Sequence, residues 1–170
     1  MVDIDSWRDP GQFMSAAGQP GRVIVGRLLP GIDLVEGVAE ICKRHDVRQA
    51  LIVGVIGSLL NPRFSGYVRG VPASEARPGR VPLVMNAPEG PAHLLSGQGL
   101  VCRTEDGTEP VVHLHCVIED AEGNLRGGCF RESGTIVLSV AEVTLVEVTG
   151  LQLIRRRDPA TGRVFTVPSQ

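Results

Sequence analysis

The sequence predicts an α+β fold in which a mostly antiparallel β-sheet of about seven strands packs with one main helix. The first observation is composition, because 23 of the 170 residues are valine and six are aromatic, and β-branched side chains favour strands. The second is periodicity, because one segment near the start has apolar residues at helical spacing. The third is that the other apolar segments are short and separated by turn-forming residues, as in hairpins.

The helix is expected to begin at Asp33 and to end near Asp46. Asp33 with Glu36 three residues later is a capping-box pattern, which satisfies backbone amides of the first helical turn. The apolar residues on one face of this helix are Leu34, Val38, Ile41 and Cys42. An apolar face of this kind predicts that the helix covers one side of the sheet.

Seven segments are predicted as strands, at residues 22–29, 49–59, 63–69, 93–102, 111–119, 125–131 and 135–148. Segment 49–59 is apolar almost throughout, which predicts a central strand that is buried on both faces. The length of the chain corresponds to about one domain. We interpret residues 1–21 as an N-terminal arm, 22–162 as the domain, 70–92 as a long proline-rich loop within it, and 163–170 as a C-terminal tail.

Charge and hydropathy argue against several classes of protein. The formal net charge of −2 disfavours binding of DNA through bulk positive charge. The longest apolar run, residues 50–60, is shorter than the roughly 20 residues that cross a bilayer. The N-terminus is acidic and polar, unlike a signal peptide, and the four cysteines form no C-x-x-C pair. We therefore expect a cytoplasmic protein with no membrane partner and no disulfide framework.

The strongest local pattern is His113-Leu114-His115 with Cys129 downstream. Side chains two residues apart in a strand share a face, so both imidazoles point the same way. If the predicted strands 111–119 and 125–131 form a hairpin about a turn at residues 120–124, His115 lies opposite Cys129. All three donors then converge. This set suits zinc or another divalent transition metal. The glycines at 127 and 128 would let a partner chain or a ligand approach closely.

A purely structural interpretation remains open for the same residues. A shift of one residue in the hairpin register would turn Cys129 to the other face. The histidines could then be hydrogen-bonded beside the core, with Cys129 as a packing residue. Glu142 lies in an otherwise apolar stretch, so it is either a solvated residue or a buried carboxylate that acts as an acid or base.

The chain also resembles a known family, the PPC domain (plants and prokaryotes conserved). The resemblance covers about residues 22–162 and rests on the order of several short motifs rather than on any one of them. These are Pro30-Gly31, the capped helix, residues 50–59, 95–97, His113-Leu114-His115, 120–123, Gly127-Gly128, 141–143, and Arg155 with 158–162. The resemblance implies an α+β fold, a homotrimer and a polar cluster that looks like a metal site, with Cys129 in place of the last histidine. Plant members carry AT-hooks and act on DNA and protein partners, and stand-alone bacterial members are often called DNA-binding proteins. This chain has no AT-hook core.

Three functions follow as hypotheses. The first is a homotrimer with a metal or small-ligand pocket at His113, His115 and Cys129, with Glu142 and Arg63 as catalytic groups if the protein is a metal-assisted lyase, isomerase or hydrolase. The second is a DNA-binding or regulatory protein-interaction module without catalytic activity. The third is a structural trimer in which the histidines are satisfied inside the protein.

Overall fold

The computed structural model describes residues 14–68, 70, 83–107, 109–130, 133–157 and 164–170. These residues form one sheet of ten strands, and the only helix among them is α1. The predicted α+β class and its mostly antiparallel sheet are therefore confirmed, and the expected number of about seven strands is too low. The strands are β1 (Gln19–Leu28), β2 (Ala50–Leu60), β3 (Phe64–Tyr67), β4 (Leu83–Asn86), β5 (Pro91–Arg103), β6 (Pro110–Glu119), β7 (Leu125–Phe130), β8 (Ile136–Thr149), β9 (Gln152–Arg157) and β10 (Val164–Ser169), and α1 is Leu34–Arg44.

The additional strands are β4, β9 and β10. β4 lies inside the segment interpreted as the proline-rich loop 70–92, and β5 begins before that segment ends. Residues 71–82 of the loop, 1–13 of the predicted arm and the motif at 158–162 lie outside the described residues. The segments interpreted as an arm and a tail contribute to the sheet, because β1 begins at Gln19 and β10 pairs with β9.

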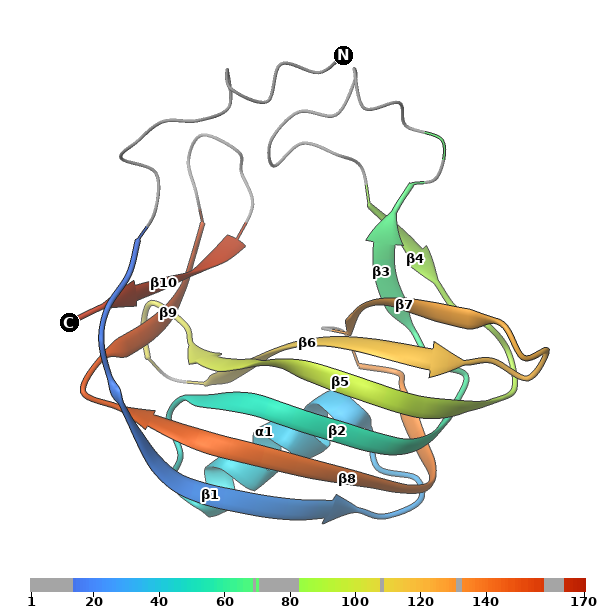
Figure 1. Ribbon diagram of the computed structural model, residues 1–170, viewed down its shortest axis with the longest axis horizontal. Coiled ribbons are helices and arrows are strands. Elements are labelled where there is room, and N and C mark those ends of the chain that lie inside the picture. The colour runs from blue at the N-terminus through green and yellow to red at the C-terminus, as the bar shows by residue number, and fades with distance from the viewer. Residues whose placement is uncertain (1–13, 69, 71–82, 108, 131–132, 158–163) are drawn as a thin grey trace.

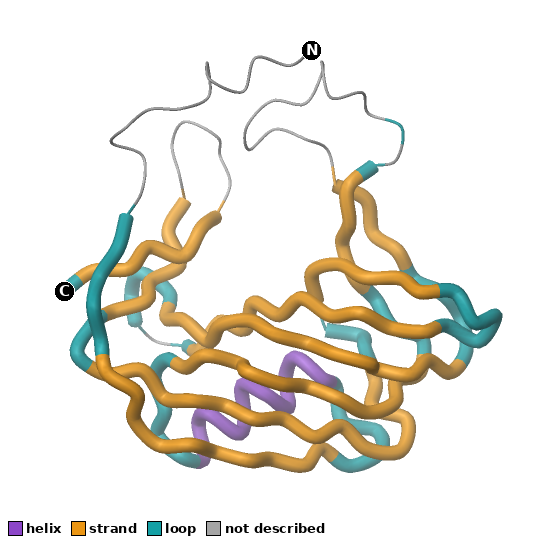
Figure 2. Tube along the Cα trace, viewed as in Figure 1, coloured by secondary structure: helices purple, strands orange, loops and turns teal. Residues whose placement is uncertain are grey.

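The sheet runs in the order β1-β8-β2-β5-β6-β7-β3-β4, and β9 joins it through a short parallel contact with β5. Figure 1 shows the long central strands side by side, with α1 along one face. The β3–β4 and β9–β10 hairpins rise from opposite ends of the sheet, on the side away from the helix (Figures 1 and 2).

The helix begins where the sequence predicted. The Asp33 carboxylate accepts hydrogen bonds from Val35 N at 2.9 Å and Glu36 N at 3.1 Å through one oxygen. Its other oxygen accepts from Gly134 N and Thr135 N, just before β8. Asp33 therefore caps the helix and attaches it to the sheet with one buried side chain.

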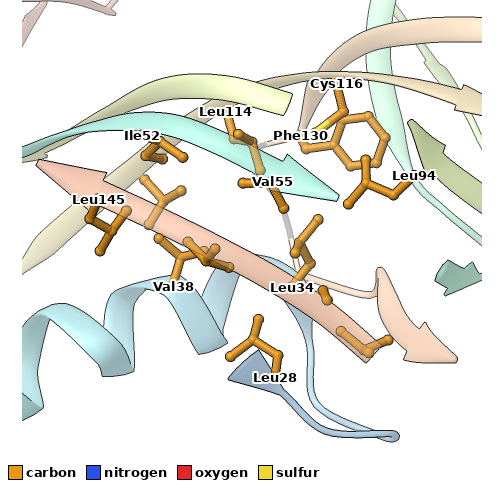
Figure 3. Close-up of a cluster of buried hydrophobic side chains, with 14 of the residues drawn as sticks. Leu28, Leu34, Val38, Ile52, Val55, Leu94, Leu114, Cys116, Phe130 and Leu145 are labelled. Carbon is orange, nitrogen blue, oxygen red and sulfur yellow. The ribbon is translucent and has the colours of Figure 1, made fainter. Parts of the chain in front are cut away.

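The core lies between α1 and one face of the sheet. Leu34 and Val38 of the helix are fully buried and lie close to the buried side chains of Val55 and Leu145 (Figure 3). Strand β2 is central, as predicted, because it lies between β8 and β5. The prediction that both of its faces are buried is wrong for the single chain, since Leu51, Val53 and Ile56 are 40%, 44% and 52% exposed.

One face of β2 is exposed because α1, the one helix among the described residues, covers only the other face of the sheet. Apolar side chains on the opposite face are exposed on several neighbouring strands, and we call this surface the helix-free face. Its members on β1, β2 and β8 are Val23, Val25, Leu51, Val53, Ile56 and Leu138. The sequence of β2 is therefore apolar on two faces, although the one helix among the described residues covers only one of them.

Candidate metal centre

The β6–β7 hairpin has the register that the sequence predicted. Asp120 N donates to Asn124 O, which closes the turn. The Asp120 carboxylate also accepts from Glu122 N at 3.1 Å and Asn124 N at 2.8 Å, and it pairs with Arg126. His115 is then directly opposite Cys129 in the antiparallel ladder.

This register brings three donor side chains together on the helix-free face. One ligating atom each from His113, His115 and Cys129 lies within 4.8 Å of the others. Within the described part of the chain, it is the one group of three or more His, Cys, Asp and Glu side chains that could hold a metal ion. His115 is exposed and the other two are partly buried, so the cluster is open to ligands. The neighbouring Cys116 is buried in the core on the other face, because side chains alternate along a strand.

The two imidazoles already face each other. Their Nε2 atoms are 3.1 Å apart, and the rings lie edge to face with centroids 5.0 Å apart. Two nitrogens bound to one tetrahedral zinc at about 2.0–2.1 Å lie about 3.3 Å apart. The ring separation therefore fits a shared metal ion with little movement. Two imidazoles and a thiolate are also a donor set that zinc accepts.

Strand β3 holds the cysteine side of the cluster. Ser65 pairs with Cys129, and its hydroxyl donates to the Cys129 carbonyl at 3.4 Å. A Cβ on Gly128 would lie 2.8 Å from Phe64 Cδ2 and would also collide with the Ser65 carbonyl. Gly128 thus allows β3 of the same chain to lie close against β7. The predicted approach of a partner chain or a ligand at these glycines stays a prediction.

Arg155 also contacts the cluster, although a run of three arginines such as 155–157 is typical of a solvated strand end. Its side chain is 8% exposed, and its Nη1 lies 3.4 Å from His113 Nδ1. The same nitrogen donates to Thr166 Oγ1 at 3.1 Å, and Nη2 donates to the Val164 carbonyl at 2.9 Å. Alternation along β9, where Leu153 and Arg155 are both buried, is the pattern that could have identified it.

Gln98 is a second polar neighbour that the sequence analysis did not single out. It pairs directly with His115 across β5 and β6, so the two side chains project from the same face. The Gln98 side chain is exposed beside the cluster. An amide at this position can donate to or accept from a ligand bound at the histidines.

The two predicted catalytic groups are placed differently. Glu142 is on the helix-free face, but β2 and β5 separate its strand β8 from β6. At about 4.8 Å per strand this is roughly 14 Å, beyond hydrogen-bond reach of the histidines within one chain. Arg63 precedes β3, its backbone is hydrogen-bonded to Thr135, and its side chain lies beside Gly134. Catalytic roles for both residues stay predictions.

All four cysteines are free thiols, and they differ in environment. Burial raises the pKa of Cys42 to about 11 and that of Cys116 to about 12. Burial also raises the pKa of the Cys102 thiol. Cys129 is the one cysteine that is not fully buried, so it is the thiol that a metal ion can reach.

No helix among the described residues combines the length and the apolar composition that a membrane span requires. Comparison with curated proteins finds the bifunctional protein GlmU of Synechococcus sp. (strain JA-3-3Ab), 28% identical over 165 residues, with 92% of this chain and 22% of that protein covered. The same protein from strain JA-2-3B'a(2-13) is 28% identical over 138 residues, with 80% and 18% covered. The chain thus spans about a fifth of the length of the curated relatives it matches.

Several solved structures share the fold. A PPC protein from Pyrococcus horikoshii has a TM-score of 0.69 at 23% identity, with 90% of this chain and 96% of that chain covered. A metal-containing protein from Archaeoglobus fulgidus has a TM-score of 0.70 at 20% identity, with 92% and 99% covered. A candidate DNA-binding protein from Ralstonia eutropha has a TM-score of 0.59 at 15% identity, with 84% and 88% covered.

The sequence identities to these proteins are too low to assign a family, but a family model matches the chain. It is described as the Plants and Prokaryotes Conserved (PCC) domain, and it matches residues 15–149. The matched segment runs from before β1 to the end of β8 and includes the whole donor cluster. The resemblance seen in the sequence is confirmed, and the chain belongs to the Plants and Prokaryotes Conserved domain family.

Proposed function

We propose that this protein binds zinc or another divalent transition metal through His113, His115 and Cys129. The observation that carries the proposal is the convergence of two imidazoles and one accessible thiol within 4.8 Å on adjacent strands. Strands hold ligands more rigidly than loops do, which favours a built site over a chance encounter of side chains. A structural neighbour is itself named as a metal-containing protein, which supports the same reading.

Three protein donors leave a fourth position of a tetrahedral ion open to water or to a small ligand. A metal bound there would polarise a carbonyl group or activate water, as in lyases, isomerases and hydrolases. The chain's own contribution would be to orient the donors and to place the Gln98 amide beside His115. This makes a small molecule with a carbonyl or carboxylate group the ligand class that the site suits.

We further propose that the protein assembles with copies of itself, as a homotrimer, through the helix-free face. Val25 and Ile56 on this face are 75% and 52% exposed. Contiguous apolar surface of this kind is a common mark of a protein interface. A ligand pocket between copies would bring groups such as Glu142 near a neighbouring copy's cluster, although they are distant within one chain.

Metal content tests the first proposal directly. Protein purified without a histidine tag is incubated with zinc, dialysed and measured by elemental analysis. We expect about one zinc per chain in the wild type and less than about a tenth in His115→Ala and Cys129→Ala. His93→Ala is the matched control, because His93 is an exposed histidine on β5 whose ring faces Glu119 rather than the cluster. Equal zinc in all four proteins would remove the site from consideration.

Binding of DNA is the alternative function. It is favoured by the name of the Ralstonia eutropha neighbour, and it is disfavoured by the net charge of −2. The salt dependence of DNA retention distinguishes the two functions. A protein that contacts several phosphates loses affinity steeply as the salt concentration rises, so retention that is absent at low salt argues against this alternative.

A further inference from the structure

Cys129 is the one donor of the cluster whose chemistry a mild oxidant changes. A cysteine sulfur is oxidised first to a sulfenic acid, whereas imidazole nitrogens resist such oxidants. Zinc binds the sulfur as a thiolate, and oxidation removes the thiolate. Because the cluster has three donors, loss of the sulfur leaves two imidazoles, which are too few protein ligands to hold zinc tightly.

The four cysteines differ in how well a dissolved oxidant reaches them. Cys42 and Cys102 are 0% exposed and Cys116 is 4% exposed, whereas Cys129 is partly exposed. Buried thiols are inert, and partly exposed thiols react. A peroxide is hardly larger than water, so a pocket between copies that admits a small ligand also admits the oxidant. Oxidation is therefore expected at the cluster before it occurs at any other cysteine.

We propose that Cys129 makes metal binding at this cluster sensitive to peroxides, a form of regulation that rests on the proposed metal function. The sulfur of Cys129 bonds to one peroxide oxygen while the oxygen–oxygen bond breaks. Sulfur is oxidised by two electrons to a sulfenic acid, and the other oxygen is reduced, leaves as hydroxide and takes up a proton to form water. The zinc ion then dissociates from the two remaining imidazoles.

Two of the other cysteines lie on the wrong side of the sheet to form a disulfide with Cys129. A disulfide requires Cα atoms within about 7 Å and Cβ vectors that point toward each other. Cys116 is on the adjacent strand, where its own partner is Gly128, but its side chain belongs to the hydrophobic core. Cys42 lies on α1 and packs in the same core.

The third cysteine is too far along the sheet. Cys102 pairs with Val111 of β6, whereas Cys129 pairs with His115, four residues further along the same strand. At about 3.3 Å per residue this offset is roughly 13 Å. The sulfenic acid should therefore persist until a small thiol condenses with it, releasing water. A second thiol then attacks the mixed disulfide, which regenerates the Cys129 thiol and leaves the small molecule as its disulfide.

Peroxide-driven zinc release tests the proposal in the zinc-loaded wild type. Limiting hydrogen peroxide is added in the presence of a coloured chelator that is too weak to remove zinc from the untreated protein. We expect release of about one zinc per chain, and recovery of about one zinc after a small thiol and fresh zinc are added. A dione reagent that traps sulfenic acids, located by peptide mass spectrometry, should mark Cys129 before the buried cysteines.

Thiol counts in two variants identify the sensitive sulfur without any metal. We expect peroxide to remove about one thiol per chain from the zinc-free wild type and from Cys102→Ala, and almost none from Cys129→Ala. Cys102→Ala is the matched control, because its thiol is fully buried and distant from the cluster. Circular dichroism verifies that each variant keeps the fold. Loss of thiols from Cys129→Ala as fast as from the wild type would overturn the proposal.

The outcomes separate the two proposals. Zinc that stays bound during peroxide treatment, or that leaves while Cys129 is unmarked, refutes the regulation and leaves the metal function standing. A wild-type protein that binds no zinc refutes the metal function, and the regulation with it. If Cys129→Ala does not fold, the position of the dione mark in the wild type decides.

Discussion

Replacing Gly128 with alanine tests how β3 is held against the donor cluster of His113, His115 and Cys129. Gly128 lies on β7, next to Cys129, where β3 crosses closely. The new methyl group would lie 2.8 Å from Phe64 Cδ2 and would overlap the Ser65 carbonyl. Phe64 cannot retreat easily, because its ring stacks on Phe130 with centroids 5.2 Å apart. The methyl group must therefore push the β3 backbone away from β7.

Overpacking of this kind costs about 1–3 kcal/mol in the free energy of unfolding. For a chain of this size, about 1 kcal/mol shifts the melting temperature by about 2–4 °C, so Gly128→Ala should melt about 2–12 °C lower. Gly54→Ala is the matched control, since a Cβ there meets no atom within 4 Å and φ is not positive. That variant should be unchanged or more stable by about 0.4–1 kcal/mol, because alanine restricts the unfolded chain.

The assay is chemical and thermal unfolding of the three proteins at one protein concentration, since self-association shifts apparent stability. Zinc affinity is a second measurement, because displacement of β3 also moves Ser65 away from the Cys129 carbonyl. We expect weaker zinc binding in Gly128→Ala and no change in Gly54→Ala. Equal melting temperatures for Gly128→Ala and the wild type would show that β3 does not press on β7 as described.

Two further measurements follow from particular contacts. The Arg126 guanidinium, with the backbone and side-chain donors of Asn124, lowers the pKa of Asp120 to about 2; the stabilisation from this carboxylate is therefore present above the ordinary aspartate pKa of about 4 and is lost as pH falls toward 2. Asp120→Asn should have a lower urea midpoint than the wild type at neutral pH, with the gap closing in acid; a gap that is constant across this range contradicts the assignment. On the helix-free face, Ile56→Arg should reduce the molar mass measured by light scattering, whereas Ile32→Arg, 44% exposed on the helix side, should not. Equal masses for the two variants would count against assembly through that face.

The donor cluster was predictable from the sequence because each step of the inference was local. Strand alternation places His113 and His115 on one face, and the turn closed by Asp120 and Asn124 sets the register. A hairpin register depends on a few turn residues, so it can be counted from the sequence. Cys129 then falls opposite His115 without any information from distant parts of the chain.

Arg155 was not predictable in the same way, because its burial depends on long-range contacts. Strand β9 meets the main sheet through a single parallel pair, Arg103 with Ile154, and its other partner is β10. Strand alternation puts Arg155, which contacts His113, and Arg156, which pairs with Glu105 at 2.7 Å, on opposite faces, but it does not show which of the two faces is covered. The burial of β2 was overpredicted for a related reason. Its apolar pattern indicates that both faces avoid water, but it does not indicate whether residues of the same chain pack on each face.

The position of the cluster within the sheet explains how its donors are oriented before any ligand binds. The hairpin that carries them is fixed at its turn by the Asp120 carboxylate and along β7 by the crossing of β3. A site supported from two directions should change little on binding, which favours affinity because few side chains need to be ordered. Arg155 reaches His113 from outside the main ladder, because it lies on the β9–β10 hairpin. The fold thus separates the strands that carry the donors from the hairpin that contacts one of them, so substitutions in β9 and β10 should leave the register of β6 and β7 intact.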